Sequence, residues 1–283
     1  TSPITGTVTT VDVTIGQQAS TGSAITVDQT PQVRFWIDET DAGKVVVGNT
    51  VNVTFGAYDN LTFTGKVVRI DPALVTVNGS NTVQVMINDG TGLFTVGPPI
   101  PVGMGPESLV LADIDKDGDL DIVTANKLSN NVTVIKNKGD GTAEPNPMNI
   151  KSDMAPVSVA VGDIDSDTIP DIVTACQASN NVSVSIKIGT PEVTTYQLPV
   201  GMAPSSVVVE DTDGNGFPEI IASGTGSNKI TVYKNLGNLN IQPFELTTEA
   251  SPRGLAYVDM NGDGFGDIVV PAAGANSIDF FLN

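Results

Sequence analysis

The sequence predicts an all-β protein whose last two thirds repeat one structural unit. Three observations support this prediction. Apolar residues spaced with the period of a helix are missing, while Gly, Pro, Thr, Val and Asn are abundant. Short segments such as residues 45–55 alternate apolar and polar residues, as strands with one buried face do. An acidic segment of nine residues occurs four times, at spacings of 50, 48 and 48 residues.

Residues 1–90 form the first predicted domain, which has strand-like segments but no acidic segment. Residues 3–25 resemble the second half of a lipoyl-like hairpin domain. VRFWIDE (33–39), VGNTV (47–51) and FTGKVVRIDP (63–72) resemble the β-barrel domain of bacterial membrane-fusion (periplasmic adaptor) proteins. The resemblance implies an N-terminal β-barrel-like domain and an adaptor role in an export complex. The first lipoyl half and the coiled-coil hairpin of that family are absent, and a generic barrel or sandwich that serves as a spacer fits the same residues.

Residues 91–283 form the second predicted domain, in which two further markers keep the spacing of the acidic segments. A proline precedes each acidic segment, and an asparagine follows it. Because both series are spaced 50, 48 and 48 residues apart, these are true internal repeats. The prolines are Pro106, Pro156, Pro204 and Pro252, and the asparagines are Asn130, Asn180, Asn228 and Asn276.

Each repeat has room for about four short strands. In the first repeat, residues 108–112 lead into the acidic segment, 122–125 leave it, and 131–136 and 148–151 follow. Four strands in about 48 residues match one blade of a β-propeller, so four propeller-type blades are predicted. The last repeat stops after its third strand, at 278–282, and the strand at 93–96 has no blade before it. We expect these two strands to pair and close a ring of four blades.

The acidic segments are called loops 1 to 4 and span residues 113–121, 163–171, 211–219 and 259–267. Their pattern, Asp-x-Asp-x-Asp-Gly-x-x-Asp-Ile-Val, resembles FG-GAP and VCBS repeats, known from integrin α-chain propellers and many bacterial surface proteins. The resemblance covers about two thirds of the chain and is weakest in loop 2, where Thr168 replaces the glycine. The family usually builds about seven blades, so a four-blade ring, a fragment and an assembly completed by another chain all remain open.

The spacing of the acidic residues predicts a Ca²⁺ site in each loop. Side-chain oxygens at positions 1, 3 and 5 of a tight loop converge on one point, position 7 offers a backbone carbonyl, and position 9 closes the site. A glycine at position 6 permits the sharp turn, and Ca²⁺ prefers six or more oxygen ligands. The predicted side-chain ligands are Asp113, Asp115, Asp117 and Asp121; Asp163, Asp165, Asp167 and Asp171; Asp211, Asp213, Asn215 and Glu219; and Asp259, Asn261, Asp263 and Asp267. The predicted carbonyl ligands are those of Asp119, Ile169, Phe217 and Phe265.

Up to four Ca²⁺ ions are therefore expected, and their role is expected to be structural. Clustered carboxylates repel one another, so removal of the metal should loosen each turn. An EF-hand is disfavoured because strands flank every loop. The alternative is an acidic turn stabilised by Asx hydrogen bonds without metal.

Composition excludes several classes of function. With 32 acidic and 13 basic residues the formal charge is −19, which argues against nucleic acid or an anionic membrane as a partner. The chain has no histidine, so it offers no histidine-based triad, proton shuttle or metal site, and its single cysteine, Cys176, excludes an intramolecular disulfide. No apolar run reaches the length of about 18 residues that a membrane span needs.

The function predicted from these features is non-enzymatic. We expect an extracellular or cell-surface calcium-binding protein with a structural or adhesive role, which includes a role as a subunit of a filament or larger assembly. A periplasmic location is the second choice. Edge strands and incomplete ends favour protein or polysaccharide partners and self-association. The alternatives are a glycan- or protein-binding propeller module and an adaptor in an export complex. An enzyme ranks lower, because metal ligation already explains every clustered acid.

Overall fold

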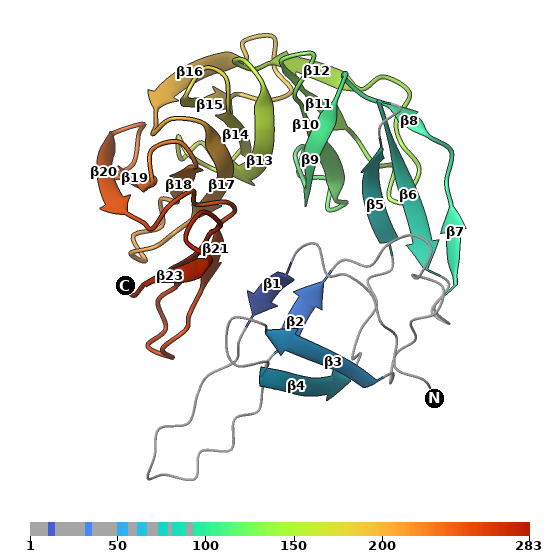
Figure 1. Cartoon of the computed structure of the whole chain (residues 1–283). Helices are drawn as coiled ribbons and strands as arrows, with labels where there is room; N and C mark the ends of the chain where they lie inside the picture. The colour runs from blue at the N-terminus through green and yellow to red at the C-terminus, as the bar shows by residue number, and fades with distance from the viewer. Residues whose placement is uncertain are drawn as a thin grey trace.

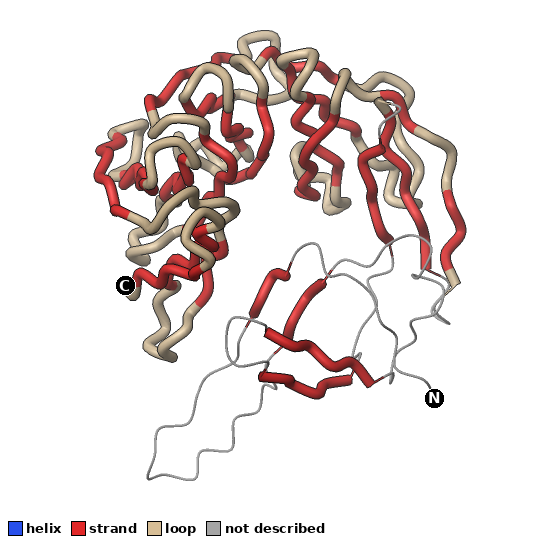
Figure 2. Tube along the Cα trace, viewed as in Figure 1, coloured by secondary structure: helices blue, strands red, loops and turns tan. Residues whose placement is uncertain are grey.

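The computed structural model describes residues 11–14, 32–35, 50–55, 61–66, 73–78, 81–88 and 93–283. All the regular elements in these residues are β-strands, joined by turns and loops (Figure 2). The prediction of an all-β protein is therefore confirmed for this part of the chain. Within the same residues, no helix is long and apolar enough to cross a membrane.

Each of the four predicted repeats forms one antiparallel sheet in which successive strands are neighbours. The first three sheets have four strands and the last has three. They consist of β9 (Pro106–Ala112), β10 (Asp121–Asn126), β11 (Asn131–Ile135) and β12 (Met148–Lys151); β13 (Pro156–Gly162), β14 (Asp171–Cys176), β15 (Asn181–Ile186) and β16 (Thr194–Pro199); β17 (Pro204–Glu210), β18 (Glu219–Gly224), β19 (Lys229–Asn235) and β20 (Ile241–Thr247); and β21 (Ala256–Val258), β22 (Asp267–Ala272) and β23 (Ser277–Phe281). These repeated four-stranded sheets are consistent with propeller-like blades.

A further sheet precedes these four. It consists of β5 (Ala73–Asn78), β6 (Thr82–Asn88), β7 (Phe94–Val96) and β8 (Ile100–Pro101), with β7 and β8 both paired to β6. The predicted pairing of residues 93–96 with residues 278–282 is therefore wrong, because Val96 pairs with Met86 of β6. A hairpin with a short connection closes at a much smaller entropic cost than a pairing across the whole repeat region.

The predicted N-terminal β-barrel lies largely outside the described residues. The strands described there form two two-stranded sheets, β1 (Val11–Thr14) with β2 (Gln32–Phe35), and β3 (Thr50–Phe55) with β4 (Leu61–Lys66). The predicted domain division at residue 90 stays a prediction, although the sheet β5–β8 draws strands from both sides of that residue.

The five larger sheets follow one another along an arc, with the first strand of each sheet toward the inside (Figure 1). Neighbouring inner strands contact one another: β9 contacts β13, and β13 contacts β17. The two small sheets lie across the open side of the arc in the same view, and β1 contacts β21.

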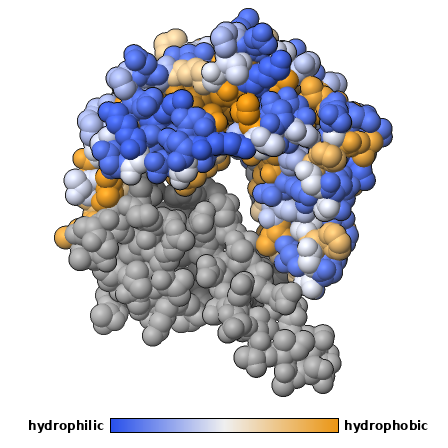
Figure 3. All heavy atoms as spheres, turned by 180° about the vertical axis from the view of Figure 1, so that it is seen from behind, coloured by the Kyte–Doolittle hydropathy of each residue, from blue (hydrophilic) through white to orange (hydrophobic). Residues whose placement is uncertain are grey.

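The apolar core is divided into clusters that lie between adjoining sheets. Val173 and Val182 of one sheet pack with Val207 and Ile220 of the next, for example. Since neighbouring sheets cover both faces, every residue of β10, β14 and β18 is buried, including the acidic residue at the start of each strand. Hydrophilic residues cover most of the described sheets seen from behind, and apolar ones show between adjoining sheets (Figure 3).

The asparagine markers lie where one sheet leads to the next, and the first three of them bond to the sheet that follows. Each lies in a turn with a left-handed backbone conformation, which asparagine tolerates better than most residues. Its side-chain carbonyl accepts the N–H of the residue before the next marker proline, at 2.8 Å for Asn130 and Asn180 and 2.9 Å for Asn228. Asn81 makes the same bond to Gly105 at 2.8 Å, so the sheet β5–β8 shares the repeat's connection although it has no acidic loop.

Candidate metal sites in the acidic loops

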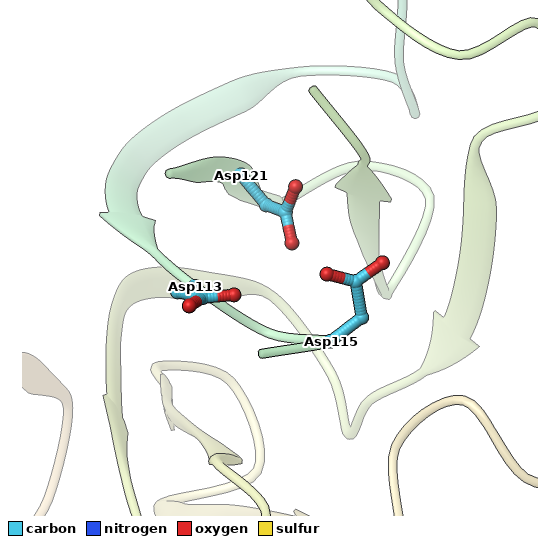
Figure 4. Close-up of side chains that lie close together, drawn as sticks. All are labelled: Asp113, Asp115 and Asp121. Carbon is cyan, nitrogen blue, oxygen red and sulfur yellow. The ribbon is translucent and has the colours of Figure 1, made fainter. Parts of the chain in front are cut away.

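Each acidic loop joins the first strand of its sheet to the second. In loop 1 the carboxylates of Asp113, Asp115 and Asp121 converge, with one oxygen of each within 4.8 Å of the others. Figure 4 shows the three side chains around a common space, with Asp121 at the start of β10. The same limit holds for Asp163, Asp165 and Asp167 in loop 2, and for Asp211, Asp213 and Glu219 in loop 3. These trios could bind a metal ion.

The first aspartate of each loop organises the backbone of the turn. The two carboxylate oxygens of Asp113 accept the N–H groups of Asp117 and Gly118, at 3.1 and 3.0 Å. Asp163 and Asp211 make the same pair of bonds in their loops, and Asp259 accepts from Gly262 and Gly264. The position-5 side chains accept the N–H of position 7 in all four loops. The Asx hydrogen bonds of the metal-free alternative are thus present, and each carboxylate oxygen keeps a further lone pair for a cation.

The closing acid of each loop is buried and ties the loop to the sheet. One oxygen of Asp121 accepts the N–H of Ile114 at 3.1 Å, and the other accepts the N–H of Asn137 at 2.9 Å. Glu219 and Asp267 have equivalent pairs of partners, which include the N–H groups of Asn235 and Asn283. Burial raises the pKa of Asp121, while the two backbone hydrogen bonds oppose that rise.

Position 6 has a left-handed backbone conformation in every loop. The φ angles are 96° at Gly118, 86° at Gly216 and 92° at Gly264, and loop 2 adopts the same turn with Thr168 at 71°. A Cβ atom at any of these three glycines would meet nothing within 4 Å, so glycine is favoured there by backbone conformation and not by space. Thr168 is β-branched, so its conformation stores backbone strain.

Lysines neutralise part of the charge in loops 1 and 3. Lys136 Nζ lies 2.8 Å from Asp115 Oδ2, and Lys234 Nζ lies 2.8 Å from Asp213 Oδ2. These hydrogen bonds lower the pKa of Asp115 and of Asp213. Each lysine follows the closing acid of its loop by 15 residues, where loop 2 has Ile186 and loop 4 has Leu282.

Loop 2 differs at its closing acid. Asp171 is fully buried, and its Oδ2 accepts the N–H of Ile164 at 2.8 Å, but its Oδ1 has no hydrogen-bond partner. In place of the asparagine found in the other repeats, Lys187 occurs here with a φ of 59°, and its carbonyl closes a tight turn with Thr190 N. Burial raises the pKa of Asp171 to about 7, and burial likewise raises the pKa of Asp165.

The predicted ligands are brought together in part. Loops 1 to 3 each assemble three carboxylates, while loop 4, with Asn261 at position 3, forms no such trio among the described acidic residues. Asp119 takes part through its N–H, which Asp117 accepts. Ligation by the carbonyls of Asp119, Ile169, Phe217 and Phe265 stays a prediction.

A second motif supports the loops and was missed in the sequence. Lys136-Asn137-Lys138-Gly139 and Lys234-Asn235-Leu236-Gly237 share the pattern Lys-Asn-x-Gly at a fixed distance after the closing acid. Asn235 Nδ2 also donates to the carbonyl of Ile164 in loop 2 of the preceding sheet, at 3.0 Å, and Asn283 Nδ2 donates to Thr212 of loop 3, at 2.6 Å. The recurrence of this pattern at one offset was the signal that could have revealed it.

The fold and these loops define a class: an all-β repeat protein built of propeller-like sheets with an acidic loop after the first strand. The FG-GAP-like repeat family matches residues 71–124, 113–174 and 211–270, together more than half of the chain. The chain therefore belongs to the FG-GAP-like repeat family. The first match begins before loop 1 and includes the whole of the sheet β5–β8.

Solved structures with similar folds have low sequence identity. A crystal structure of BBS1N in complex with ARL6DN gives a TM-score of 0.57 at 13% identity, covering 99% of this chain and 81% of that one. A functionally unknown protein from Desulfotomaculum acetoxidans gives 0.51 at 15% identity, covering 75% of this chain and 66% of that one. No match was found among curated proteins. These similarities concern the fold alone, and they give no support to the membrane-fusion-protein resemblance of residues 1–90.

Proposed function

We propose that the chain is a non-enzymatic, calcium-binding structural or adhesive protein of the cell surface, with up to four Ca²⁺ ions, one in each loop. The observation that carries this proposal is the trio of carboxylates in loops 1 to 3, held each time by the same backbone hydrogen bonds. One scaffold that recurs with acidic side chains turned to a common point is better suited to a cation than to a solvated surface.

Calcium fits these loops better than other common metals. The ligands are all oxygens, from carboxylates and an occasional amide, and the chain has no histidine for zinc or copper. Loops that must supply six or more oxygens with flexible geometry suit Ca²⁺, whereas Mg²⁺ demands near-ideal octahedral geometry.

The metal's role in this proposal is to stiffen the connection between sheets. Loop 2 carries the carbonyl of Ile164, which accepts a hydrogen bond from Asn235 of the next sheet. A cation that fixes loop 2 therefore also fixes this bridge. We place the protein outside the cell, with the periplasm as second choice, because extracellular calcium modules have dissociation constants of about 10⁻⁴ to 10⁻³ M and need a calcium-rich surrounding to be filled.

Calorimetric titration of chelated protein with CaCl₂ and, separately, MgCl₂ tests the proposal. We expect calcium uptake with a rise in the thermal unfolding midpoint, and weaker or no uptake of magnesium. Asp163→Ala should remove one calcium site. Glu192→Gln is the control: Glu192 pairs with Lys187 outside the acidic loops, so its loss of charge should leave the number of calcium sites unchanged. Absence of calcium uptake in the unsubstituted protein would refute the proposal.

A protein-binding module is the second candidate, favoured by the fold similarity to BBS1N, whose structure was solved in complex with ARL6DN. Electron microscopy with and without chelator separates the two. Calcium-dependent filaments or larger assemblies support the structural role, whereas discrete particles that bind one partner protein support the binding module.

A further inference from the structure

A pocket of about 460 Å³ lies beside the outer half of the sheet β9–β12. It is lined by residues 101–104 of the connection that follows β8, by Pro145 and Pro147 ahead of β12, and by residues of β11 and β12. Ser129, in the turn from β10 to β11, also lines it, so the pocket opens toward the end of the sheet opposite loop 1. Its volume is within the range of about 300–1,000 Å³ that small-molecule sites have.

Two asparagines line this pocket, and a buried network fixes their orientation. Asn149 Oδ1 accepts hydrogen bonds from Asn131 Nδ2 at 3.0 Å and from Thr133 Oγ1 at 2.9 Å. Asn126, which is fully buried, donates from Nδ2 to Thr133 Oγ1 at 2.9 Å and to Asn131 Oδ1 at 3.2 Å. The side-chain oxygens of both asparagines are thus engaged within the network, which holds the two amides in place before any ligand binds.

The N–H groups of these amides are only partly used. Asn149 Nδ2 makes no hydrogen bond to any residue that the structure describes, and Asn131 Nδ2 makes one, to Asn149. Because an amide nitrogen carries two hydrogens, two donors remain at Asn149 and one at Asn131. A molecule that fits the pocket should therefore offer oxygen acceptors.

The first feature that sets this repeat apart is a proline in the outer strand. Pro147 takes the register position of Thr195, which pairs with Ser185 in the second sheet. A proline has no backbone N–H, so the pairing of β11 with β12 extends only as far as Val134 with Met148. The chain ahead of Met148 leaves the sheet, which makes room for the pocket.

The second feature is a glycine where the next repeat has an acid. A Cβ atom at Gly103 would lie 2.4 Å from Asn131 Oδ1 and 2.4 Å from Ser129 Oγ, so a side chain there would displace both groups. The equivalent residue of the second repeat is Asp153, whose carboxylate accepts a hydrogen bond from Asn181 Nδ2 at 2.6 Å. The second repeat therefore spends on its own aspartate a donor that the first repeat keeps for a ligand.

The pocket is uncharged, although the chain has a formal charge of −19. In the third repeat Lys229 and Glu245 take the positions of Asn131 and Asn149 and form an ion pair. An acidic ligand would meet no cation in the pocket and would be repelled by the chain, and a basic ligand would meet no carboxylate. The prolines and Met104 add apolar surface, so the ligand should be neutral with one polar and one apolar side.

A neutral saccharide has both sides, since its hydroxyl oxygens accept hydrogen bonds and its C–H face packs on apolar surface. A peptide added as a strand needs backbone N–H groups beside it, which Pro145 and Pro147 lack. We propose that this pocket binds a neutral saccharide through the amides of Asn131 and Asn149. The inference goes beyond the proposed calcium binding and does not depend on it, because no acid of the loops lines the pocket.

Saturation-transfer NMR with a panel of saccharides tests the inference. The neutral probes are glucose, galactose, mannose, N-acetylglucosamine, cellobiose and lactose, and the charged comparators are glucuronic acid and glucosamine. Each is measured in excess calcium and again with EDTA. We expect at least one neutral saccharide to bind with a dissociation constant of about 1 mM, since small ligands gain little free energy per atom. The charged comparators should bind about tenfold more weakly or not at all, and EDTA should change nothing.

Variants of the chain locate the site. Asn149→Asp keeps the oxygen that accepts two hydrogen bonds but removes the NH₂ group, and should weaken saccharide binding about tenfold or more. Gln197→Glu makes the matched change at the equivalent position of the second sheet and should have no effect. Pro147→Thr introduces the residue that the second sheet has at this position, and should weaken binding while the protein stays folded. Circular dichroism checks the fold of each variant.

Four results would overturn the inference. The first is no binding of any neutral saccharide of the panel, and the second is binding that Asn149→Asp leaves unchanged. The third is binding that EDTA abolishes, which would place the saccharide at the acidic loops. The fourth is binding of the neutral peptide acetyl-tetraalanine amide in place of every saccharide, which would assign the pocket to a polypeptide. The calcium proposal is tested separately by metal uptake and would survive each of these results.

Discussion

Loops 1 and 3 differ from loop 2 in how their negative charge is balanced. In loops 1 and 3 a lysine ammonium lies 2.8 Å from the position-3 carboxylate, and both oxygens of the closing acid accept backbone N–H groups. In loop 2 the lysine is replaced by Ile186, and one oxygen of the buried Asp171 has no partner.

The turns themselves are nevertheless alike, since Asp163 makes the same two backbone bonds as Asp113 and Asp211. The conformation of each turn is thus set by hydrogen bonds within the nine-residue loop. The negative charge of the loop is balanced from outside it, by the two residues that lie 15 and 16 positions after the closing acid. Loop 2 has the strongest electrostatic reason to hold a cation, although its sequence departs most from the repeat pattern.

The largest expected effect is on the pH dependence of metal-free stability. The pKa of Asp171 is raised from 3.8 to about 7, so its contribution to stability is fully present below about pH 4 and is lost as the pH rises through about 7. A rise of about three pKa units corresponds to at most about 4 kcal/mol.

We therefore expect the unfolding midpoint of chelated protein to rise as the pH is lowered from 8 to 5, measured by circular dichroism. Asp115 and Asp213, whose pKa values are lowered, lose their contributions only at more acidic pH. Asp171→Asn should flatten the profile in this window. An unchanged profile in Asp171→Asn would contradict the assignment to Asp171.

Amide substitution of the closing acids should then act in opposite directions in loops 1 and 2. Asp121→Asn places an NH₂ group against a backbone N–H, because both oxygens of Asp121 are acceptors, and should lower the free energy of unfolding by about 1–3 kcal/mol. In Asp171→Asn the NH₂ group can take the place of Oδ1, the oxygen that accepts no hydrogen bond. Because this variant also removes a buried negative charge, it should stabilise the chelated protein at pH 8. Urea unfolding of both variants measures the difference, and equal destabilisation would count against it.

A smaller effect is expected at position 6 of the loops. Thr168→Gly should relieve the strain of a β-branched residue at a φ of 71° and stabilise the protein by about 1 kcal/mol. The matched change, Gly118→Thr in loop 1, should destabilise by a similar amount, because space is available but the conformation is unfavourable. Thermal unfolding at pH 5, where Asp171 is mostly protonated, separates strain from charge. A stabilising Gly118→Thr would contradict this explanation.

The sequence predicted the repeated sheets and the loops because local residues determine both. Three markers in one register, the proline, the acidic segment and the asparagine, each correspond to a contact within or between neighbouring sheets. The strand pairing of residues 93–96 could not be predicted in this way, since the sheet β5–β8 has the asparagine marker but no acidic segment to reveal it. The unpartnered oxygen of Asp171 depends on the backbone of Lys187, which the spacing of acids does not encode.

The smallest expected effect tests whether lysines compete with metal in loops 1 and 3. Lys136→Met removes the ammonium that lies against Asp115. It should increase the calcium affinity of loop 1 several-fold, because Ca²⁺ then does not have to break the Lys136–Asp115 ion pair in order to bind. Metal-free stability should change by less than about 1 kcal/mol, since the pair is partly exposed to solvent. Lys234→Met should act alike in loop 3, while Lys127→Met, whose partner Glu107 lies outside the loops, serves as the control. Calorimetric titration resolves the comparison. If all three variants bound calcium with the same affinity, Lys136 and Lys234 would not compete with Ca²⁺ for the carboxylates of loops 1 and 3. The two ion pairs would then balance the charge of these loops independently of any bound metal.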